Sequence, residues 1–204
     1  MLAVCNLTVT RGGAAVLAGV SFDVGAGAAL VLRGPNGIGK TTLLRTLAGL
    51  QPALSGEVVV APDTCAYASH ADGVKAALTV RENLQFWAEV HGTEIDDSAF
   101  DHFDIADLKD RAAGTLSAGQ KRRLGLARLA VVNRPVLLLD EPTVSLDGFS
   151  VKLFATFLKD QHLAKGGAAV IATHIDLGLD LPELDLTPYQ ATQADTGASD
   201  EAFL

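Results

Sequence analysis

The stretch Gly34-Pro35-Asn36-Gly37-Ile38-Gly39-Lys40-Thr41-Thr42 decides how the rest of this chain folds. It follows an apolar run, residues 28–32, that is typical of a buried strand. It precedes residues 41–48, in which three leucines recur at the spacing of a helix that packs on a sheet. The sequence therefore predicts a strand, a glycine-rich loop and a helix in direct succession.

The loop has the pattern G-x-x-x-x-G-K-T, and each residue type in it suits the binding of phosphate. Its glycines reach backbone conformations that other residues avoid, so successive N–H groups can face one anion, and the following helix adds its positive end. Lys40 is expected to reach the β- and γ-phosphates of a nucleotide, and the Thr41 hydroxyl to ligate Mg²⁺. We therefore expect a P-loop whose nucleotide contacts are Gly34, Pro35, Asn36, Gly37, Ile38, Gly39, Lys40, Thr41 and Thr42.

The composition limits the class of protein. With 204 residues, 49% of them hydrophobic, the chain suits one domain with a well-filled core. Its apolar runs are interrupted well before the roughly 18 residues of a membrane helix, and residues 1–10 lack the pattern of a signal peptide. We expect a cytosolic chain that reaches a membrane only through a partner. The net charge of -8 argues against a sequence-independent nucleic-acid binder, so we expect no nucleic-acid partner.

Alternating apolar residues predict short strands on both sides of the loop. Residues 2–10 and 16–24 predict an antiparallel hairpin, and residues 56–61 and 64–68 continue the strand pattern. The two cysteines, Cys5 and Cys65, are isolated in these segments. We expect both to be reduced core residues rather than metal ligands or a disulfide.

A helical block is expected in the middle of the chain. Thr79 and Glu82 have the spacing of a capping box, in which each side chain bonds the other residue's backbone N–H. The polar residues 92–113 carry an intermittent apolar face. We expect residues 1–204 to form a single domain, with a helical subdomain at about 72–130 inserted into an α/β core. The polar segment at about 184–204 is expected to be a last short strand or a loosely ordered tail.

A second possible anion site begins at Leu116-Ser117-Ala118-Gly119-Gln120. Ser117 is a good N-cap, Gly119 permits close backbone approach, and the apolar residues beyond Arg123 give the helix a buried side. On physical grounds alone, the segment fits an anion-binding helix end and an ordinary capped helix equally well.

A third motif, Val136-Leu137-Leu138-Leu139-Asp140-Glu141-Pro142, joins an apolar run to two carboxylates. Such a run predicts a central parallel strand that is buried on both faces. Asp140, at its carboxyl end, is placed to bind Mg²⁺ through water, and Glu141 can accept a proton from an attacking water. Because the chain also has a P-loop, we favour this interpretation over a solvated acidic turn.

Together these motifs resemble the nucleotide-binding subunit of ATP-binding cassette (ABC) transporters, from the hairpin to about residue 180. Residues 116–120 resemble the family's signature motif, Ser145-Leu146-Asp147 its D-loop, and His174 its switch histidine. The resemblance implies an α/β P-loop NTPase of ABC type, with a mixed central sheet, an N-terminal antiparallel β part and an inserted helical subdomain. It also implies that the chain is an ATPase with ATP and Mg²⁺ as cofactors.

The resemblance implies a mechanism as well. Two cassettes would form a head-to-tail homodimer, with each ATP between the P-loop of one chain and the signature motif of the other. The protein would polarise water for attack on the γ-phosphate and neutralise the developing charge. The catalytic residues would be Glu141, His174 and Lys40, the metal ligands Thr41 and, through water, Asp140, and the signature contacts Ser117, Gly119 and Gln120.

Two positions depart from the usual cassette pattern. Where most cassettes stack an aromatic residue on adenine, this chain has Arg11, whose guanidinium offers less stacking surface, so adenine specificity is expected to be loose. Where most cassettes use a glutamine to contact Mg²⁺ and the attacking water, this chain has His70. We expect both Arg11 and His70 to contact the nucleotide site.

The sequence around His70 resembles one particular subfamily of cassettes. Residues 70–75, 78–79 and 82–84 are similar to the ATP-binding subunit of the bacterial cytochrome c maturation system, often called the haem exporter subunit. This similarity implies an integral membrane subunit as partner and a peripheral location at the cytoplasmic face of the inner membrane. It also implies an indirect link to haem and to a periplasmic chaperone, whose haem-loaded form would be released by ATP hydrolysis.

The docking surface for the membrane subunit is expected near His70 and on the helix that starts at Thr79. Phe86 and Trp87 are candidate contacts, although an aromatic pair at helical spacing is more often part of a core.

Three other interpretations stay open at this point. A soluble cassette ATPase of translation or DNA repair usually has two cassettes or a long coiled-coil insertion, and the sequence shows neither. The ATPase subunit of an unrelated exporter of drugs, peptides or lipids would share every core motif and differ only in residues 70–84. A nucleotide-binding regulator without catalysis is disfavoured because Lys40, Asp140, Glu141 and His174 are all present.

Overall fold

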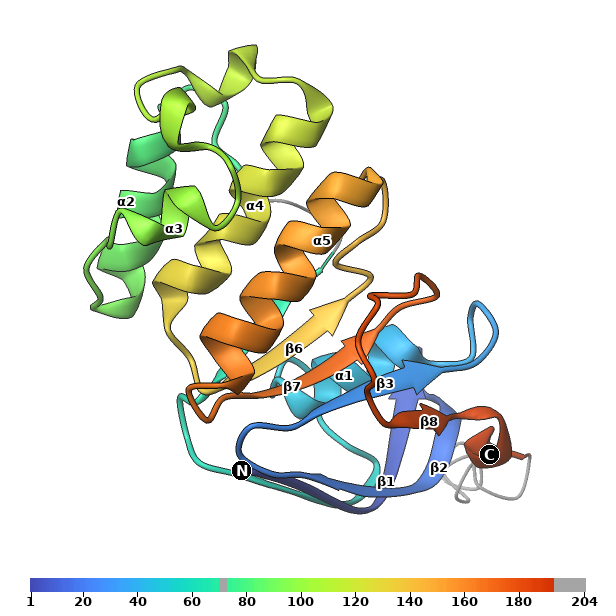
Figure 1. Ribbon diagram of the computed structural model, residues 1–204. Coiled ribbons are helices and arrows are strands. Elements are labelled where there is room, and N and C mark those ends of the chain that lie inside the picture. Colours follow the sequence, from blue (N-terminus) through green and yellow to red (C-terminus); the bar gives the residue numbers. More distant parts are fainter. Residues whose placement is uncertain (70–72, 193–204) are drawn as a thin grey trace.

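The computed structural model of the chain describes residues 1–69 and 73–192 (Figure 1). The first of its two sheets is antiparallel, with the strand order β2-β1-β4. The hairpin that joins its first two strands turns at Gly12 and Gly13, both with positive φ, and confirms the predicted hairpin. The strands of this sheet are β1 (Leu2–Arg11), β2 (Ala14–Val24) and β4 (Ser55–Val60).

The second sheet has five strands in the order β5-β6-β7-β3-β8, and every pairing in it is parallel. Its inner strands β6 and β7 are buried along their whole length, as predicted for a strand covered on both faces. The α/β class is thus confirmed, and the antiparallel strands form a sheet of their own. The strands of the parallel sheet are β3 (Ala29–Arg33), β5 (Cys65–Ala68), β6 (Val136–Asp140), β7 (Ala168–Ala172) and β8 (Glu183–Asp185).

Helix α1 (Lys40–Leu47) packs between the two sheets (Figure 1). Its buried residues Leu43, Leu44 and Leu47 belong to one cluster with residues of β1, β2, β6 and β7. Because interiors are close-packed, contacts on both sides fix the start of this helix, and with it the loop that follows β3. Strand β8 confirms the short strand expected near residue 184, while residues 193–204 of the expected tail lie outside the described part of the chain.

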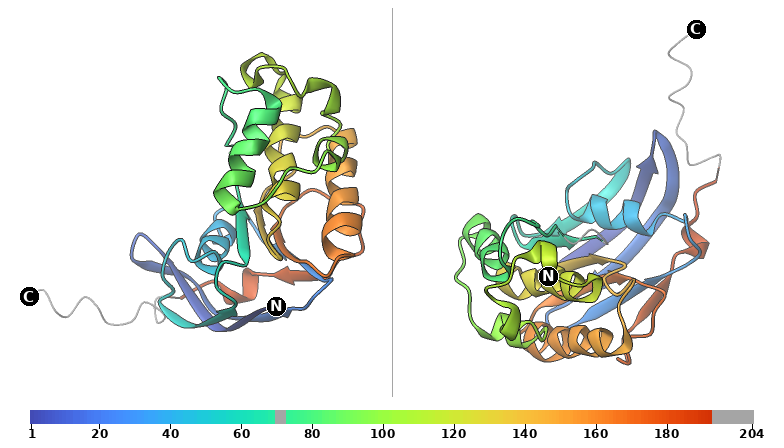
Figure 2. Two further views of the ribbon diagram at one scale, coloured as in Figure 1. Left: turned by 90° about the vertical axis from the view of Figure 1, so that its left-hand side faces the viewer. Right: turned by 90° about the horizontal axis from the view of Figure 1, so that it is seen from above.

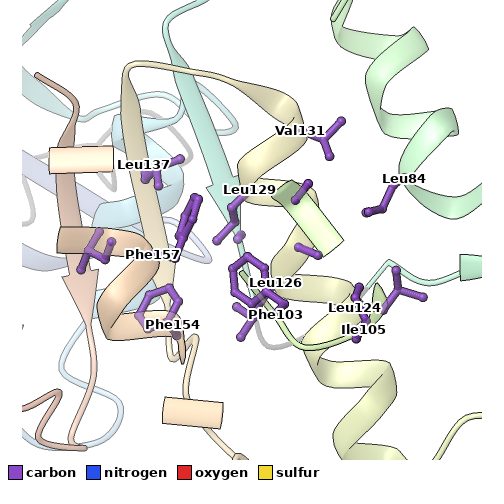
Figure 3. Packing of buried hydrophobic residues seen from close by; sticks show 14 of the residues in the cluster. Leu84, Phe103, Ile105, Leu124, Leu126, Leu129, Val131, Leu137, Phe154 and Phe157 are labelled. Carbon is purple, nitrogen blue, oxygen red and sulfur yellow. The ribbon is translucent and has the colours of Figure 1, made fainter. Parts of the chain in front are cut away.

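Helices cover the other face of the parallel sheet (Figures 1 and 2). Figure 3 shows Phe103, Phe154 and Phe157 packed with leucines of the long helix α4 and of β6. The helices of this layer are α2 (Val80–His91), α3 (Ser98–Asp101), α4 (Ala118–Val132), α5 (Gly148–Thr156) and the π-helical segment η3 (Phe157–Leu163). The short 3-10 helices are η1 (Ala106–Leu108), η2 (Ala113–Thr115) and, after β8, η4 (Thr187–Tyr189).

The middle of the chain is less helical than its pattern indicates. The capping box at α2 is confirmed, since Glu82 N donates to Thr79 Oγ1 over 3.1 Å and Thr79 N to Glu82 Oε2 over 2.7 Å. Beyond α2, however, residues 92–113 form only short helical turns, and the backbone reverses at Asp104 with a φ of 51°. Their apolar side chains, such as Phe100, are nevertheless buried against α4.

The prediction of two core cysteines is wrong for Cys5. Both cysteines are free, but Cys5 is exposed and Cys65 is half-buried. Asn6 has a φ of 48° and interrupts the register of β1, so Cys5 and Asn6 both face solvent between buried Val4 and Leu7. Among the residues that the structure describes, no helix is both long and apolar enough to cross a membrane.

Candidate active site

A cavity of about 260 Å³ opens where the P-loop meets the end of β6. It lies at the carboxyl ends of parallel strands, where α/β folds place their ligand sites. The structure therefore brings together two motifs that are about a hundred positions apart in the sequence. Its wall is formed by Arg11, Asn36, Gly37, Gly39, Lys40, Thr41, Thr42, Asp140 and Glu141.

The backbone of the loop has the conformation that its glycines predict. Gly34, Gly37 and Gly39 have φ values of 135°, 85° and 124°, which side chains rarely allow. No side chain caps α1, so the N–H groups of its first turn have no capping acceptor. Together with the helix dipole, these groups make the cavity floor attractive to anions.

Three predicted P-loop contacts do not line the cavity wall. Ile38 is buried, and its side chain lies 3.3 Å from the position that a Cβ on Gly34 would take. The carbonyls of Gly34 and Pro35 instead accept hydrogen bonds from Lys40 Nζ, at 2.7 and 3.4 Å. The loop thus holds the Lys40 ammonium at the cavity by its own backbone.

Asp140 is buried, with 4% of the residue exposed, and still borders the cavity. Tyr67, on the neighbouring strand β5, donates a hydrogen bond from its hydroxyl to Asp140 Oδ2 over 3.1 Å. Burial raises the pKa of the Tyr67 phenol, so this group remains a donor at neutral pH. Sequence reasoning did not single out Tyr67, because nothing in the local pattern links it to Asp140.

Glu141 is held from several sides. It has a φ of 50°, uncommon for a residue with a side chain, and its N–H donates to Ala172 O on β7 over 2.8 Å. Its carbonyl accepts a hydrogen bond from buried Arg122 of α4 at 3.2 Å. His174 Nδ1 lies 3.0 Å from its carboxylate oxygen Oε2. These contacts aim the Glu141 side chain at the cavity next to the P-loop.

Arg122 is another residue whose place the sequence did not indicate. It stands in the basic run Lys121-Arg122-Arg123, and charged residues are mostly exposed, but Arg122 is only 7% exposed. Besides the bond to Glu141, its guanidinium donates to Pro142 O over 2.8 Å. Arg122 therefore ties α4 to the turn that carries the two carboxylates.

The signature segment lies elsewhere in the chain. The N-cap predicted at Ser117 is confirmed, since its Oγ accepts from Gln120 N over 3.2 Å while Ser117 N donates to Gln120 Oε1 over 3.0 Å. This start of α4 is at the end of the helical layer farthest from the sheets (Figures 1 and 2). Ser117, Gly119 and Gln120 are not on the wall of the P-loop cavity.

Of the two positions that depart from the usual cassette pattern, Arg11 and His70, the structure describes only Arg11. Arg11, the last residue of β1, lies on the cavity wall, as expected for a nucleotide contact. His70 lies outside the residues that the structure describes.

A second, more apolar cleft of about 320 Å³ separates α2 and α4 from the end of α1. Trp87 and His91 form one wall, with their rings stacked at 6.2 Å, and Arg128 lies 5.3 Å from the Trp87 ring. Leu50 on the cleft wall is 63% exposed. Tyr67, which bonds Asp140, also lines this cleft.

The comparisons with known proteins agree with one another. A family model described as ABC transporter matches residues 17–144. The chain is 62% identical over 204 residues to the cytochrome c biogenesis ATP-binding export protein CcmA of Rhodobacter capsulatus, covering 100% of this chain and 95% of that protein. It is 63% identical over 194 residues to the protein of the same name from Paracoccus denitrificans, covering 95% and 92%. A solved Pyrococcus furiosus chain, described as an ABC transporter ATP-binding protein, superposes with a TM-score of 0.83 at 25% identity, covering 93% of this chain and 99% of that one.

Proposed function

The chain belongs to the ABC transporter family, and on that premise we propose that it is the ATP-hydrolysing subunit of a membrane complex for cytochrome c maturation and haem export. It converts ATP and water to ADP and phosphate. The names of its relatives, with identities above 60% over nearly the whole chain, favour this function over that of an unrelated exporter.

The contact between Glu141 and His174 carries the proposal. A nucleotide-binding regulator needs a phosphate cradle, but it does not need a carboxylate aimed at that cradle by a fixed backbone and a histidine. In this chain Glu141 borders the P-loop cavity, and His174 Nδ1 lies 3.0 Å from its carboxylate. The arrangement suits a base and a group that orients it.

ATP binds with its phosphates against the backbone N–H groups of the P-loop. Lys40, now bonded to the carbonyls of Gly34 and Pro35, reaches the β- and γ-phosphates. Arg11 contacts the base or ribose from the hairpin edge of the cavity, and His70, which stands where most cassettes have a glutamine, is a further nucleotide contact. Because a guanidinium offers less surface for stacking on adenine than an aromatic ring does, the site discriminates only weakly between ATP and other purine nucleotides.

The donor atoms at the cavity fit Mg²⁺, which prefers oxygen ligands. The Thr41 hydroxyl would hold the ion directly and Asp140 would hold it through water, since both residues line the cavity. In the described part of the chain, no group of three or more His, Cys, Asp or Glu side chains could hold a metal, which fits an ion held largely by phosphate oxygens. When bound, Mg²⁺ neutralises negative charge on the phosphates.

The chemical step is an in-line attack of water on the γ-phosphorus. Glu141 accepts a proton from the water while the water oxygen forms a bond to the γ-phosphorus. At the same time the bond between the γ-phosphorus and the bridging oxygen breaks, and its electron pair leaves with ADP. His174 keeps the Glu141 carboxylate in place and contacts the γ-phosphate. Lys40 stabilises the charge that develops on the phosphate oxygens.

Two copies of the chain form a head-to-tail homodimer around two ATP molecules. Support comes from the signature segment, whose capped helix end is far from the P-loop of its own chain. A Cβ on Gly119 would meet nothing within 4 Å, so the space above this helix end is open. We take residues 1–204 as one nucleotide-binding domain, in which residues at about 72–130 present Ser117, Gly119 and Gln120 to the partner's ATP.

An integral membrane subunit docks on the apolar cleft beside α2, with Trp87 on the cleft wall and Phe86 at its side. Both aromatic rings are only half-buried within this chain, and nearby Leu50 and Val90 are 63% and 57% exposed. This docking places the chain peripherally at the cytoplasmic face of the inner membrane. ATP turnover then acts on haem indirectly, by releasing the haem-loaded periplasmic chaperone.

The direct test is ATP turnover in the assembled membrane complex. Glu141→Gln removes the base but keeps the side chain's size, so turnover is expected to fall at least about a hundredfold while ATP binding persists. Glu57→Gln, an exposed change on β4, is the matched control and keeps wild-type turnover. Equal turnover in both variants would favour the regulator and overturn the proposal.

A further inference from the structure

Tyr67 connects the wall of the apolar cleft to the carboxylate at the end of β6. In the parallel register of β5 and β6 it pairs with Leu138, so its side chain lies on the same face of the sheet as Leu138 and Asp140. The side chain leans along the strand, and its hydroxyl reaches Asp140 Oδ2 at 3.1 Å. The same residue lines the cleft beside Trp87. Tyr67 thus joins the wall of the apolar cleft to Asp140, which lines the P-loop cavity.

Asp140 needs such a contact. It is 4% exposed, and a buried polar group that lacks a hydrogen-bond partner costs free energy. A bond at one carboxylate oxygen also restricts rotation about the Cβ–Cγ bond, which is otherwise broad. The Tyr67 hydroxyl therefore satisfies one oxygen of this buried carboxylate and sets the direction of the second oxygen.

We propose that Tyr67 is a positioning residue for the nucleotide site: its hydroxyl orients the Asp140 carboxylate toward the metal-bound nucleotide. The inference rests on the proposed function, because it assigns Tyr67 a role in that same site. It differs from a purely structural role, in which the hydroxyl would only satisfy its own hydrogen bond inside the fold. A positioning role predicts that loss of the hydroxyl weakens nucleotide binding only when Mg²⁺ is present, whereas a purely structural role predicts the same effect with and without Mg²⁺.

The test compares Tyr67→Phe with Tyr189→Phe in the full chain. Tyr67→Phe removes the hydroxyl and keeps the ring, and Tyr189, the other tyrosine of the chain, packs at the opposite sheet. The affinity for a non-hydrolysable ATP analogue is measured by calorimetry, once with saturating Mg²⁺ and once with EDTA. We expect Tyr67→Phe to weaken binding about three- to tenfold with Mg²⁺ and to leave it unchanged with EDTA, since a net hydrogen bond contributes about 1 kcal/mol. Tyr189→Phe should match the wild type in both.

A double-mutant cycle shows whether Tyr67 acts through Asp140. Asp140→Ala, which removes the acceptor of the Tyr67 hydroxyl, should by itself weaken the Mg²⁺-dependent affinity, and adding Tyr67→Phe to it should weaken that affinity no further. Equal losses with Mg²⁺ and with EDTA, or additive losses in the double variant, would overturn the positioning role. If the wild-type chain itself bound no analogue under either condition, the proposed function would fail, and this inference with it.

Discussion

His174 Nδ1 lies 3.0 Å from Glu141 Oε2, although 33 positions separate the two residues in the chain. Each stands just beyond the end of a buried parallel strand, Glu141 after β6 and His174 two residues after β7, and these strands are neighbours. The His174 side chain is 67% exposed and that of Glu141 is 21% exposed. The pair thus has a fixed base next to the cavity and a histidine that can still reach a ligand.

Substitution of His174 should separate catalysis from binding. His174→Asn keeps a donor near the Nδ1 position, and His174→Gln keeps one near the Nε2 position, but neither can contact both Glu141 and the γ-phosphate. We expect both variants to lose at least about tenfold in kcat while their ATP affinity stays within about threefold of wild type. His102→Gln, remote from the cavity, serves as the control. Wild-type kcat in either His174 variant would contradict a catalytic role for this pair.

Lys40 should affect nucleotide binding without affecting the fold. Its ammonium donates hydrogen bonds to the loop carbonyls of Gly34 and Pro35. Lys40→Met therefore removes the positive charge from the site but keeps most of the side chain's volume. We expect the rise in Tm that ATP produces in the wild type to disappear in this variant, while the Tm without nucleotide stays within a few degrees. Lys152→Met, an exposed change on α5, is the control. A Lys40 variant still stabilised by ATP would remove this residue from the site.

Gly119 tests the head-to-tail arrangement. A Cβ at this position meets nothing within 4 Å in the single chain, so Gly119→Leu should fold normally, and its helix start tolerates leucine. In the proposed dimer, however, the new side chain would enter the space of the partner's ATP. We expect ATP binding by the isolated chain to be retained and turnover in the complex to fall at least about tenfold. Gly25→Leu, also in open space, is the control; equal turnover in both would argue against the dimer.

His162 should make the stability of the fold depend on pH. Its ring packs against Gly167, and its Nε2 lies 2.9 Å from Ala168 O. Burial lowers the pKa of His162 from its usual value of 6.5, so the unfolded chain binds this proton more readily. The contribution of neutral His162 to the free energy of unfolding is therefore complete above about pH 6.5, and it is lost as the pH falls toward the pKa of His162 in the folded chain.

We expect the free energy of unfolding of the wild type to decrease from about pH 7.5 to about pH 5.5, and His162→Gln to show a shallower slope. Some slope should remain, because burial also lowers the pKa of His91. Chemical denaturation at several pH values measures both slopes. Parallel slopes would show that His162 titrates alike in the folded and unfolded chain.

The features that the sequence predicts well are local ones. The strand, loop and helix around Lys40 depend on neighbouring residues, the capping box at Thr79 depends on a partner three positions away, and the N-cap at Ser117 depends on the start of its own helix. In each case the residue types restrict the backbone before any distant contact forms, so pattern and structure agree.

The features that the sequence does not predict depend on register and on distant contacts. Tyr67 reaches Asp140 only because β5 and β6 pair in one particular register, across 73 positions of sequence. Arg122 is charged and stands between two other basic residues, yet the packing of α4 buries it against the turn at Glu141. Cys5 follows buried Val4 and therefore faces solvent, and the irregularity at Asn6 then shifts the alternation so that Leu7 is buried.

Staining of membranes for covalently bound haem shows whether ATP hydrolysis at Glu141 serves cytochrome c maturation. The cells should use this maturation system and carry Glu141→Gln as their only copy of the gene, with Glu57→Gln as the control. We expect c-type cytochromes to lose their haem stain while the Glu141 variant stays abundant and membrane-associated. Normal staining in those cells would contradict it and would assign the ATPase to another transport process.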